Sequence, residues 1–227
     1  MPLDRRFDHP TLALAALLLS CHAATARGQT SADLSFVSEY AGRGVALYDR
    51  PALQLRVEHD FASGWYGGAF ASPVSFEGRS QAQFIAYGGH ARQLGPNLSW
   101  DAGVTRTTFM RDGGASYHEF YVGLSMRRAS ARLFYAPAYY GEGRTVYLDL
   151  STAYPLNDAW RLTAHVGLMH PFGDYDTSLR DSGDLRLALV GDIGDYTLQA
   201  GWQARWRTYL PEFPRPRAFS VSVSRHF

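Results

Sequence analysis

The sequence predicts an all-β protein, namely an antiparallel transmembrane β-barrel of about twelve strands preceded by a cleaved signal peptide. Three observations predict it. The first segment shows the charge, short apolar run and small residues of a secretory signal. In the rest of the chain, apolar residues recur at every second position, which is the period of a strand with two different faces. These runs are about ten residues long, the length that a tilted strand needs to cross a bilayer.

The composition excludes several classes of protein. The 227 residues are 46% hydrophobic, 14% aromatic and 19% charged, with a formal net charge of +1. An average soluble domain is about 25% charged, so this chain is poor in charge and rich in rings. Its near-neutral charge lacks the basic footprint of a nucleic-acid binder, and we expect no nucleic-acid partner. The single cysteine, Cys21, excludes a disulfide scaffold and a multi-cysteine metal site.

Residues 1–26 are expected to be the signal peptide and residues 27–227 the barrel. Arg5 and Arg6 precede an apolar run at 11–19, and residues 24–26 (ATA) supply a cleavage signal. The run is about half of the ~20 residues that a membrane-spanning helix requires. Two alternatives stay open: a lipidated N-terminus at Cys21, because residues 18–21 (LLSC) resemble a lipoprotein signal, and a buried N-terminal helix. A cleaved signal peptide and a lipoprotein signal would both take the protein out of the cytoplasm.

Turn residues divide the rest of the chain into twelve expected strands. Alternation is clear where Leu53, Leu55 and Val57 are interleaved with polar residues, and again at 219–224. The expected strands are 32–42, 52–61, 65–74, 81–93, 98–109, 117–126, 130–140, 145–154, 160–169, 184–192, 196–207 and 218–227.

The connections between these strands alternate in kind. Tight turns are expected at 62–64, 95–97, 127–129, 156–158 and 194–195. Mostly longer loops are expected at 43–51, 75–80, 112–116, 141–144, 171–183 and 208–217. Short turns at one end, longer loops at the other and an even strand count are typical of a bacterial outer-membrane barrel. Both termini then lie on the periplasmic side.

A soluble β-sandwich also alternates, so three further features are needed to favour a barrel. The polar face of many strands carries charges. Rings gather near strand ends, where interfacial girdles belong; they are Trp65, Tyr66, Trp100, Tyr139, Tyr140, Trp160, Trp206 and Tyr209. The chain stops on Phe227 after an alternating apolar run, which resembles the terminal strand read by the barrel-assembly machinery, although Arg225 interrupts it. We therefore expect that machinery and outer-membrane lipid as partners.

If the apolar residues face lipid, the other set lines the lumen. The expected pore-lining residues are Arg43, Arg56, Glu58, Asp101, Glu119, Arg132, Asp149, Arg161, His165, Arg186 and Arg205. Side chains fill a barrel of eight strands, whereas sixteen strands leave a water channel, so twelve predict a narrow pore lined by both signs of charge. The alternative is that these charges pair across the lumen and seal it.

No catalytic residue, metal site or cofactor is predicted. The motifs G-x-S-x-G and H-E-x-x-H do not occur. The acidic loop at 171–183 lacks the glycine and closing glutamate of an EF-hand, which favours a solvated loop. An enzyme that modifies outer-membrane lipid stays an alternative; it needs a Ser–His pair on the outer half of adjacent strands, near lipid, with His118 and His165 as the histidines to test.

Residues 38–45 (SEYAGRGV) resemble the opening motif of the TorF-type porin family of proteobacteria. Residues 51–54 (PALQ) and 63–68 (SGWYGG) are similar to the next two family elements, and weaker matches follow in order at 87–89, 101–104, 119–123 and 165–167. Gly42 and Leu55 stand where family members usually have an aromatic and a small residue. The resemblance covers nearly the whole mature chain and implies an outer-membrane barrel that acts as a pore, without implying a substrate or a catalytic residue.

Arg43 is the residue that this motif singles out, and two roles are open for it. It can attract anionic solutes at the outer mouth of a pore. It can instead tie down the first loop by bonding loop carbonyls or Glu39, because a guanidinium offers five donors; the structural role is favoured. The leading functional expectation is a channel in the cell outer membrane through which small hydrophilic solutes diffuse passively, and not an enzyme. A lipid-modifying barrel enzyme, a sealed structural barrel and a secreted sandwich are the alternatives.

Overall fold

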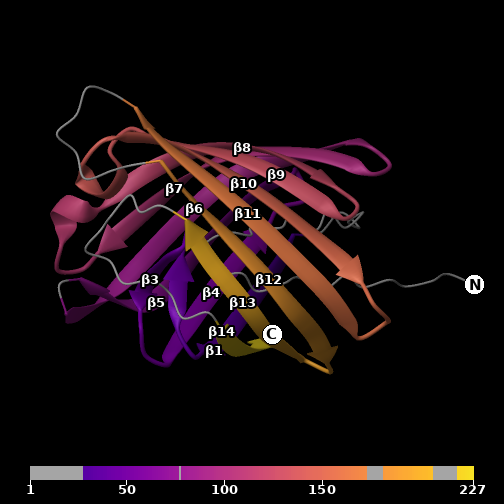
Figure 1. Ribbon diagram of the computed structural model, residues 1–227. Helices are drawn as coiled ribbons and strands as arrows, with labels where there is room; N and C mark the ends of the chain where they lie inside the picture. The colour runs from indigo at the N-terminus through magenta and orange to yellow at the C-terminus, as the bar shows by residue number, and fades with distance from the viewer. Residues whose placement is uncertain (1–27, 77, 173–180, 207–218) are drawn as a thin grey trace, which may run out of the picture.

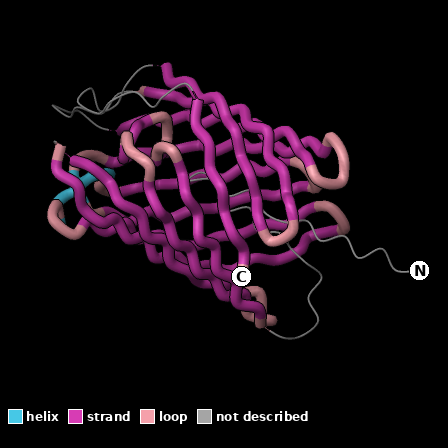
Figure 2. Tube along the Cα trace, turned by 90° about the horizontal axis from the view of Figure 1, so that it is seen from below, coloured by secondary structure: helices cyan, strands magenta, loops and turns pink. Residues whose placement is uncertain are grey.

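The computed structural model describes residues 28–76, 78–172, 181–206 and 219–227. Within these ranges the chain forms a closed barrel of twelve antiparallel strands, which confirms the predicted fold class (Figures 1 and 2). The strands of the wall are β1 (Gln29–Val37), β4 (Ala52–Asp60), β5 (Trp65–Phe76), β6 (Arg79–Gly95), β7 (Leu98–Phe109), β8 (Tyr117–Met126), β9 (Ala129–Ala136), β10 (Arg144–Pro155), β11 (Trp160–Phe172), β12 (Ser182–Ile193), β13 (Tyr196–Trp206) and β14 (Phe219–His226).

Each strand of the wall pairs with the strands before and after it, and β1 closes the ring by pairing with both β4 and β14. At this closure Ser35 is opposite Ser224 on one side and Gln54 on the other. The start of β1 and the end of β14 share one end of the barrel with the short turns; we call it the terminal end. The longer connections lie at the opposite end, which we call the loop end (Figure 1). None of the described residues forms a helix that is long and apolar enough to cross a membrane.

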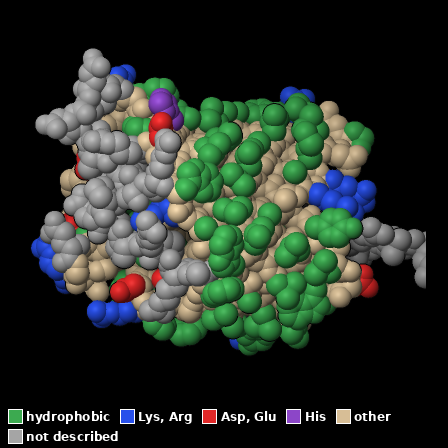
Figure 3. Space-filling model, viewed as in Figure 1, with side chains coloured by type: hydrophobic (Ala, Val, Ile, Leu, Met, Phe, Trp, Pro, Cys, Tyr) green, Lys and Arg blue, Asp and Glu red, His purple; other side chains and the backbone are tan. Residues whose placement is uncertain are grey.

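The two faces of the wall differ in chemistry. Large apolar side chains stand on the outer face, where Leu53, Phe120 and Val221 are each more than half exposed. They form a band across the strands, while charged side chains gather toward both ends of the barrel (Figure 3). Polar and aromatic side chains at the intervening positions point inward and are buried, as in Gln54 and Asp101. A belt of this kind suits contact with lipid, because a bilayer covers a broad apolar surface that would be unfavourable in water.

The expected first strand at 32–42 is wrong as a single element. The chain leaves the wall after Val37 and forms an inner hairpin of β2 (Tyr40–Gly42) and β3 (Val45–Tyr48). Ser38 marks the departure: its N–H donates to the Val221 carbonyl, and its Oγ accepts from the Val221 N–H. Arg43 and Gly44 form the hairpin turn with φ values of 48° and 71°. Two successive left-handed residues make the turn that matches the twist of a tight hairpin.

Two other boundaries differ from the expectation. The loop expected at 75–80 is shorter, because β5 continues to Phe76 and β6 begins at Arg79. The strand expected at 130–140 ends at Ala136, since Pro137 has no N–H with which to continue the ladder. A short 3-10 turn, η2 (Tyr139–Gly141), follows it, and a similar turn, η1 (Gly113–Ala115), precedes β8. Most of the expected acidic loop, at 173–180, lies outside the described residues, as do residues 1–27 and the expected loop at 208–217.

Placing a charge in the apolar belt tests this orientation. Val122 lies in the middle of β8, pairs with Ala102 and Leu133, and is 52% exposed. In a bilayer, Val122→Arg is expected to lower the free energy of unfolding by about 2–4 kcal/mol, because an arginine at the midplane must be buried in hydrocarbon. Urea unfolding in phospholipid vesicles measures this. Ser63→Arg, on an exposed turn, is the control; equal stability of both variants would contradict a lipid-facing β8.

Candidate functional site: the lumen and its inner hairpin

The inner hairpin, residues 38–48, crosses the lumen from its root between β1 and β4. Tyr40 is fully buried, packs on Phe70 with ring centroids 5.8 Å apart, and donates a hydrogen bond of 3.0 Å to Gln83 Oε1. On another side of the lumen, a Cβ placed on Gly44 would lie 2.8 Å from Asp184 Cβ, so only glycine allows this approach. The hairpin therefore contacts both β5–β6 and β12, and it fills the centre of the lumen.

Arg43 fixes the tip of the hairpin to the wall. Its guanidinium donates to both carboxylate oxygens of Glu119 on β8, at 2.8 and 3.1 Å, and both side chains are buried. The same guanidinium lies 4.2 Å from the ring centroid of Tyr147, with Phe134 and Tyr139 slightly further away. A two-pronged arginine–carboxylate pair is among the strongest side-chain contacts and specifies orientation as well as distance.

Arg43 lies in the hairpin turn, outside the strands of the wall, and it stays charged there. Burial is the largest single influence and lowers the pKa of its guanidinium, but Glu119, Tyr139 and Tyr117 together raise it by more, so the pKa stands well above its ordinary value. The structure thus gives Arg43 a tying role, although its partner is Glu119 and not Glu39 or a loop carbonyl.

A second charged pair lies deeper along the same wall. Arg132 Nη2 on β9 is 2.7 Å from Asp101 Oδ2 on β7, and Tyr66 donates to the same carboxylate at 3.3 Å. Tyr66 also shares a short hydrogen bond with Tyr121. Gly123 on β8 makes room for the pair, because a Cβ there would collide with Asp101. The pair joins strands on either side of β8 and occupies the space above it.

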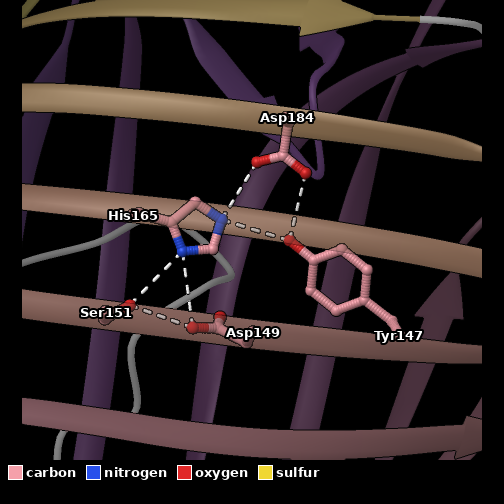
Figure 4. A network of polar contacts seen from close by, with 5 residues as sticks. All are labelled: Tyr147, Asp149, Ser151, His165 and Asp184. Carbon is pink, nitrogen blue, oxygen red and sulfur yellow. Dashed lines mark hydrogen bonds and ion pairs between the residues drawn. The ribbon is translucent and has the colours of Figure 1, made fainter.

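His165 on β11 is the centre of a third network (Figure 4). Its Nε2 lies 3.0 Å from Asp184 Oδ1, and its Nδ1 lies 3.4 Å from Asp149 Oδ1 and 3.3 Å from Ser151 Oγ. The Ser151 hydroxyl donates to Asp149 at 2.9 Å, and the Tyr147 hydroxyl donates to Asp184 at 3.1 Å. All these groups face the lumen and are buried. The serine and histidine are within reach of each other on adjacent strands, but on the inner face and not beside lipid.

Further charged groups meet at the terminal end of the lumen. Arg161 forms an ion pair with Asp192, and His226 Nδ1 shares a hydrogen bond with Asp33. Thr197 bridges the two pairs, because its hydroxyl donates to Asp192 at 2.7 Å and lies 2.9 Å from His226 Nε2. Glu58, also on this side, accepts a hydrogen bond of 2.7 Å from Tyr87.

A small cavity, which we call the polar gap, remains beside β1 and β14. Its polar lining consists of Asp33, Ser35, Glu39, Gln54, Arg56, Arg186, Gln203, Ser220, Ser222 and Ser224. Its volume is about 30 Å³. A cavity needs roughly 10–15 Å³ to hold one water molecule, so this one has room for about two.

The expected pore-lining residues therefore divide into three groups. Most of them form the pairs and networks described above: Arg43 with Glu119, Asp101 with Arg132, Arg161 with Asp192, His165 with Asp149, and Glu58 with Tyr87. Arg56 and Arg186 are half-buried and line the polar gap. Arg205 lies against the hairpin turn, where its Cγ would be 3.2 Å from a Cβ on Gly44.

Several important residues were not expected inside the barrel. Tyr66 and Tyr139, predicted in the outer girdle, are buried in the lumen, whereas Trp65 and Trp206 are exposed at strand ends as expected. An aromatic residue at a strand end looks the same in the sequence whether it faces lipid or the lumen. Only its position in the inward–outward alternation of that strand tells which face it is on. Tyr40 was missed because the strand expected at 32–42 concealed the hairpin. Among the described residues, no group of three or more metal-ligating side chains is placed to hold a metal ion.

Breaking the Arg43–Glu119 pair tests its contribution to stability. Arg43→Met leaves a buried carboxylate without its cation, so the free energy of unfolding is expected to fall by about 3 kcal/mol. Combining it with Glu119→Gln should cost less than the sum of the two single changes, because the uncompensated charge is gone. Urea unfolding in vesicles measures the cycle, with Arg127→Met on an exposed turn as control. Strict additivity would show that the pair carries no coupling energy.

Comparison with known proteins supports the same architecture. No curated protein matches the chain in sequence. Among solved structures, the KdgM porin is similar with a TM-score of 0.57 at 13% identity, covering 87% of this chain and 99% of that one. The NanC porin has a TM-score of 0.59 at 12% identity, with coverages of 86% and 98%. The COG4313 outer-membrane channel from Pseudomonas putida F1 has a TM-score of 0.55 at 11% identity, with coverages of 90% and 97%.

These low identities show a shared fold and no more. The family comparison reaches further, because a family model matches residues 22–201, which is most of the chain. The chain therefore belongs to the bacterial family Gcw_chp, which is described as a bacterial protein of unknown function.

Proposed function

We propose that this protein is an outer-membrane channel through which small hydrophilic solutes diffuse passively, and that the inner hairpin is its constriction. The observation that carries the proposal is the pairing of an apolar outer belt with a polar lumen that retains a polar gap beside the hairpin. A closed barrel with these two faces is the architecture that can span a bilayer and offer a polar route through it. Residues 1–26 would direct the chain across the inner membrane, and β14 would be the strand read by the barrel-assembly machinery.

The resemblance to TorF-type porins gains a structural meaning within this proposal. Residues 38–45, which carry the most specific part of that resemblance, form the start and the turn of the inner hairpin. The motif thus contains Arg43, which holds the hairpin tip, and Gly44, which lets it approach Asp184. A shared motif at this place is consistent with a shared constriction.

Two other functions were considered, a sealed structural barrel and a lipid-modifying enzyme, and the first is the better supported of the two. A sealed structural barrel is supported by the small volume of the polar gap and by the ion pairs that hold the hairpin to β8 and link β7 to β9 inside the lumen. A lipid-modifying enzyme is less well supported, because Ser151 and His165 face the lumen (Figure 4) and the Ser151 proton is directed at Asp149. His118, the other histidine of that hypothesis, lies against Phe120, a side chain of the outer belt.

Electrical recording distinguishes a channel from a sealed barrel. The protein is expressed as the full chain, purified from outer membranes and inserted into a planar bilayer. Discrete current steps of reproducible and small conductance are expected, because the hairpin leaves only a narrow route. A folded, heat-modifiable barrel that carries no current at either polarity would overturn the proposed channel and support the sealed barrel.

Displacing the hairpin should widen this route. Gly44→Val places a branched side chain at a left-handed position against Asp184, so the hairpin should leave its seat and the conductance steps should grow. Gly78→Val is a matched control: Gly78 also has a positive φ, of 75°, but nothing lies within 4 Å of a Cβ there. Both variants carry the left-handed strain of about 1–3 kcal/mol, so a larger conductance in Gly44→Val alone reports the hairpin. Equal conductance in all three proteins would contradict its role as the constriction.

A further inference from the structure

Side chains fill the lumen closely around the tip of the hairpin and leave a gap beside its root. The hairpin ties itself to β5, β6 and β8 through Tyr40 and Arg43, and the neighbouring lumen is occupied by the Asp101–Arg132 pair and the His165 network. The polar gap lies mainly along β1, β4 and β14, with Phe70 on β5, Arg186 on β12 and Gln203 on β13 completing its lining. Its lining runs from Asp33, near the terminal end, to Glu39 and Ala41 at the root of the hairpin.

We infer that the polar gap is the path of permeation, and that it favours small uncharged hydroxylated solutes over ions. This inference rests on the proposed channel function and assigns its route and its substrate class. The route runs along the β1–β14 closure of the barrel and not through the centre, which the hairpin occupies.

The side chains along the gap supply hydrogen bonds suited to hydroxyl groups. Serines stand at alternate positions of β14, and Ser35 on β1 donates to Ser224 across the closure at 2.8 Å. Gln54 donates to Ser72 at 3.1 Å, and Gln203 donates to Glu39 at 3.0 Å. Hydroxyls and amides both donate and accept, so they can exchange bonds with a polyol at each step along the path.

The charges along the gap balance. Its lining contains two carboxylates, from Asp33 and Glu39, and two guanidiniums, from Arg56 and Arg186. Asp33 also shares a hydrogen bond with His226, and Glu39 accepts one from Gln203. A lining with both signs in equal number sets up no net potential for cations or anions, so neither ion gains an advantage. An uncharged solute also avoids the desolvation cost that an ion meets in so narrow a space.

Substituted cysteines locate the path. In the full chain carrying Cys21→Ser, Ser222→Cys places a thiol in the gap, where the side chain is half-buried. Thr107→Cys places one on β7, on the inner face but outside the gap lining, where the side chain is 1% exposed. The probe is Ag⁺, which is comparable in size to a water molecule and binds thiolate. Purified barrels in phosphatidylcholine vesicles are treated with silver nitrate, and the remaining free thiol is counted by maleimide labelling after denaturation.

The expected result is rapid loss of the Ser222→Cys thiol and slow loss of the Thr107→Cys thiol. Osmotic swelling of the same vesicles in ethylene glycol, the smallest diol, should fall after silver treatment of Ser222→Cys and stay unchanged for Thr107→Cys. Swelling that continues while the Ser222→Cys thiol stays free, or a Thr107→Cys thiol that reacts as fast, would overturn the path and leave the channel function standing. No swelling above protein-free vesicles in the Cys21→Ser parent would overturn the channel function itself.

The reversal potential in a potassium chloride gradient tests the substrate class. A value near zero is expected, because the lining charges balance. A strong preference for either ion would overturn the assignment to uncharged solutes, whichever path the cysteines identify. Arg56→Gln should then shift the reversal potential toward cation preference, whereas Arg128→Gln on an exposed turn should not.

Discussion

Closure of the sheet at β1 is the constraint on which the rest of this structure depends. Hydrocarbon offers no water to backbone N–H and C=O groups, so a sheet inside a bilayer has to pair every strand on both sides. Here β1 meets β14 on one side and β4 on the other, and the same residue, Ser35, is opposite Ser224 and Gln54. Once the ring is closed, alternate side chains have only two environments. The outer set forms the apolar belt, and the inner set is confined with its neighbours.

Confinement explains why charged side chains in the lumen occur in pairs. A buried charge is tolerated when a partner and hydrogen bonds compensate for lost water. Arg43 forms an ion pair with Glu119, Arg132 forms one with Asp101, and His165 lies between two carboxylates. Glycines on the wall give these groups room: a Cβ on Gly123 would strike Asp101, and one on Gly167 would strike both Tyr147 and Asp184. The lumen is thus organised by small residues as much as by charged ones.

The sequence allows the wall to be predicted well and the contents of the lumen less well. Period-two alternation is local, so the twelve strands and the inward parity of Asp101, Arg132 and His165 could be inferred without a structure. The partners could not, because they are separated by 19 to 76 residues and meet only through the stagger of the strands. The hairpin had one signal, the Gly-Arg-Gly sequence at 42–44, which is compatible with a turn. The alternation of 32–42 concealed it, since an inward hairpin strand also alternates.

The position of the polar gap follows from the same geometry. A hairpin rooted between β1 and β4 crosses the lumen to Glu119 on β8, and its turn also packs against Asp184 on β12. The side chains that β14 presents to the space left behind are serines, which are too small to fill it. Larger inward side chains stand where the hairpin ends: Tyr117 and Tyr147 are fully or almost fully buried near its tip. The tie between Arg43 and Glu119 therefore does more than hold the hairpin, because it decides on which side of the lumen a polar route is left.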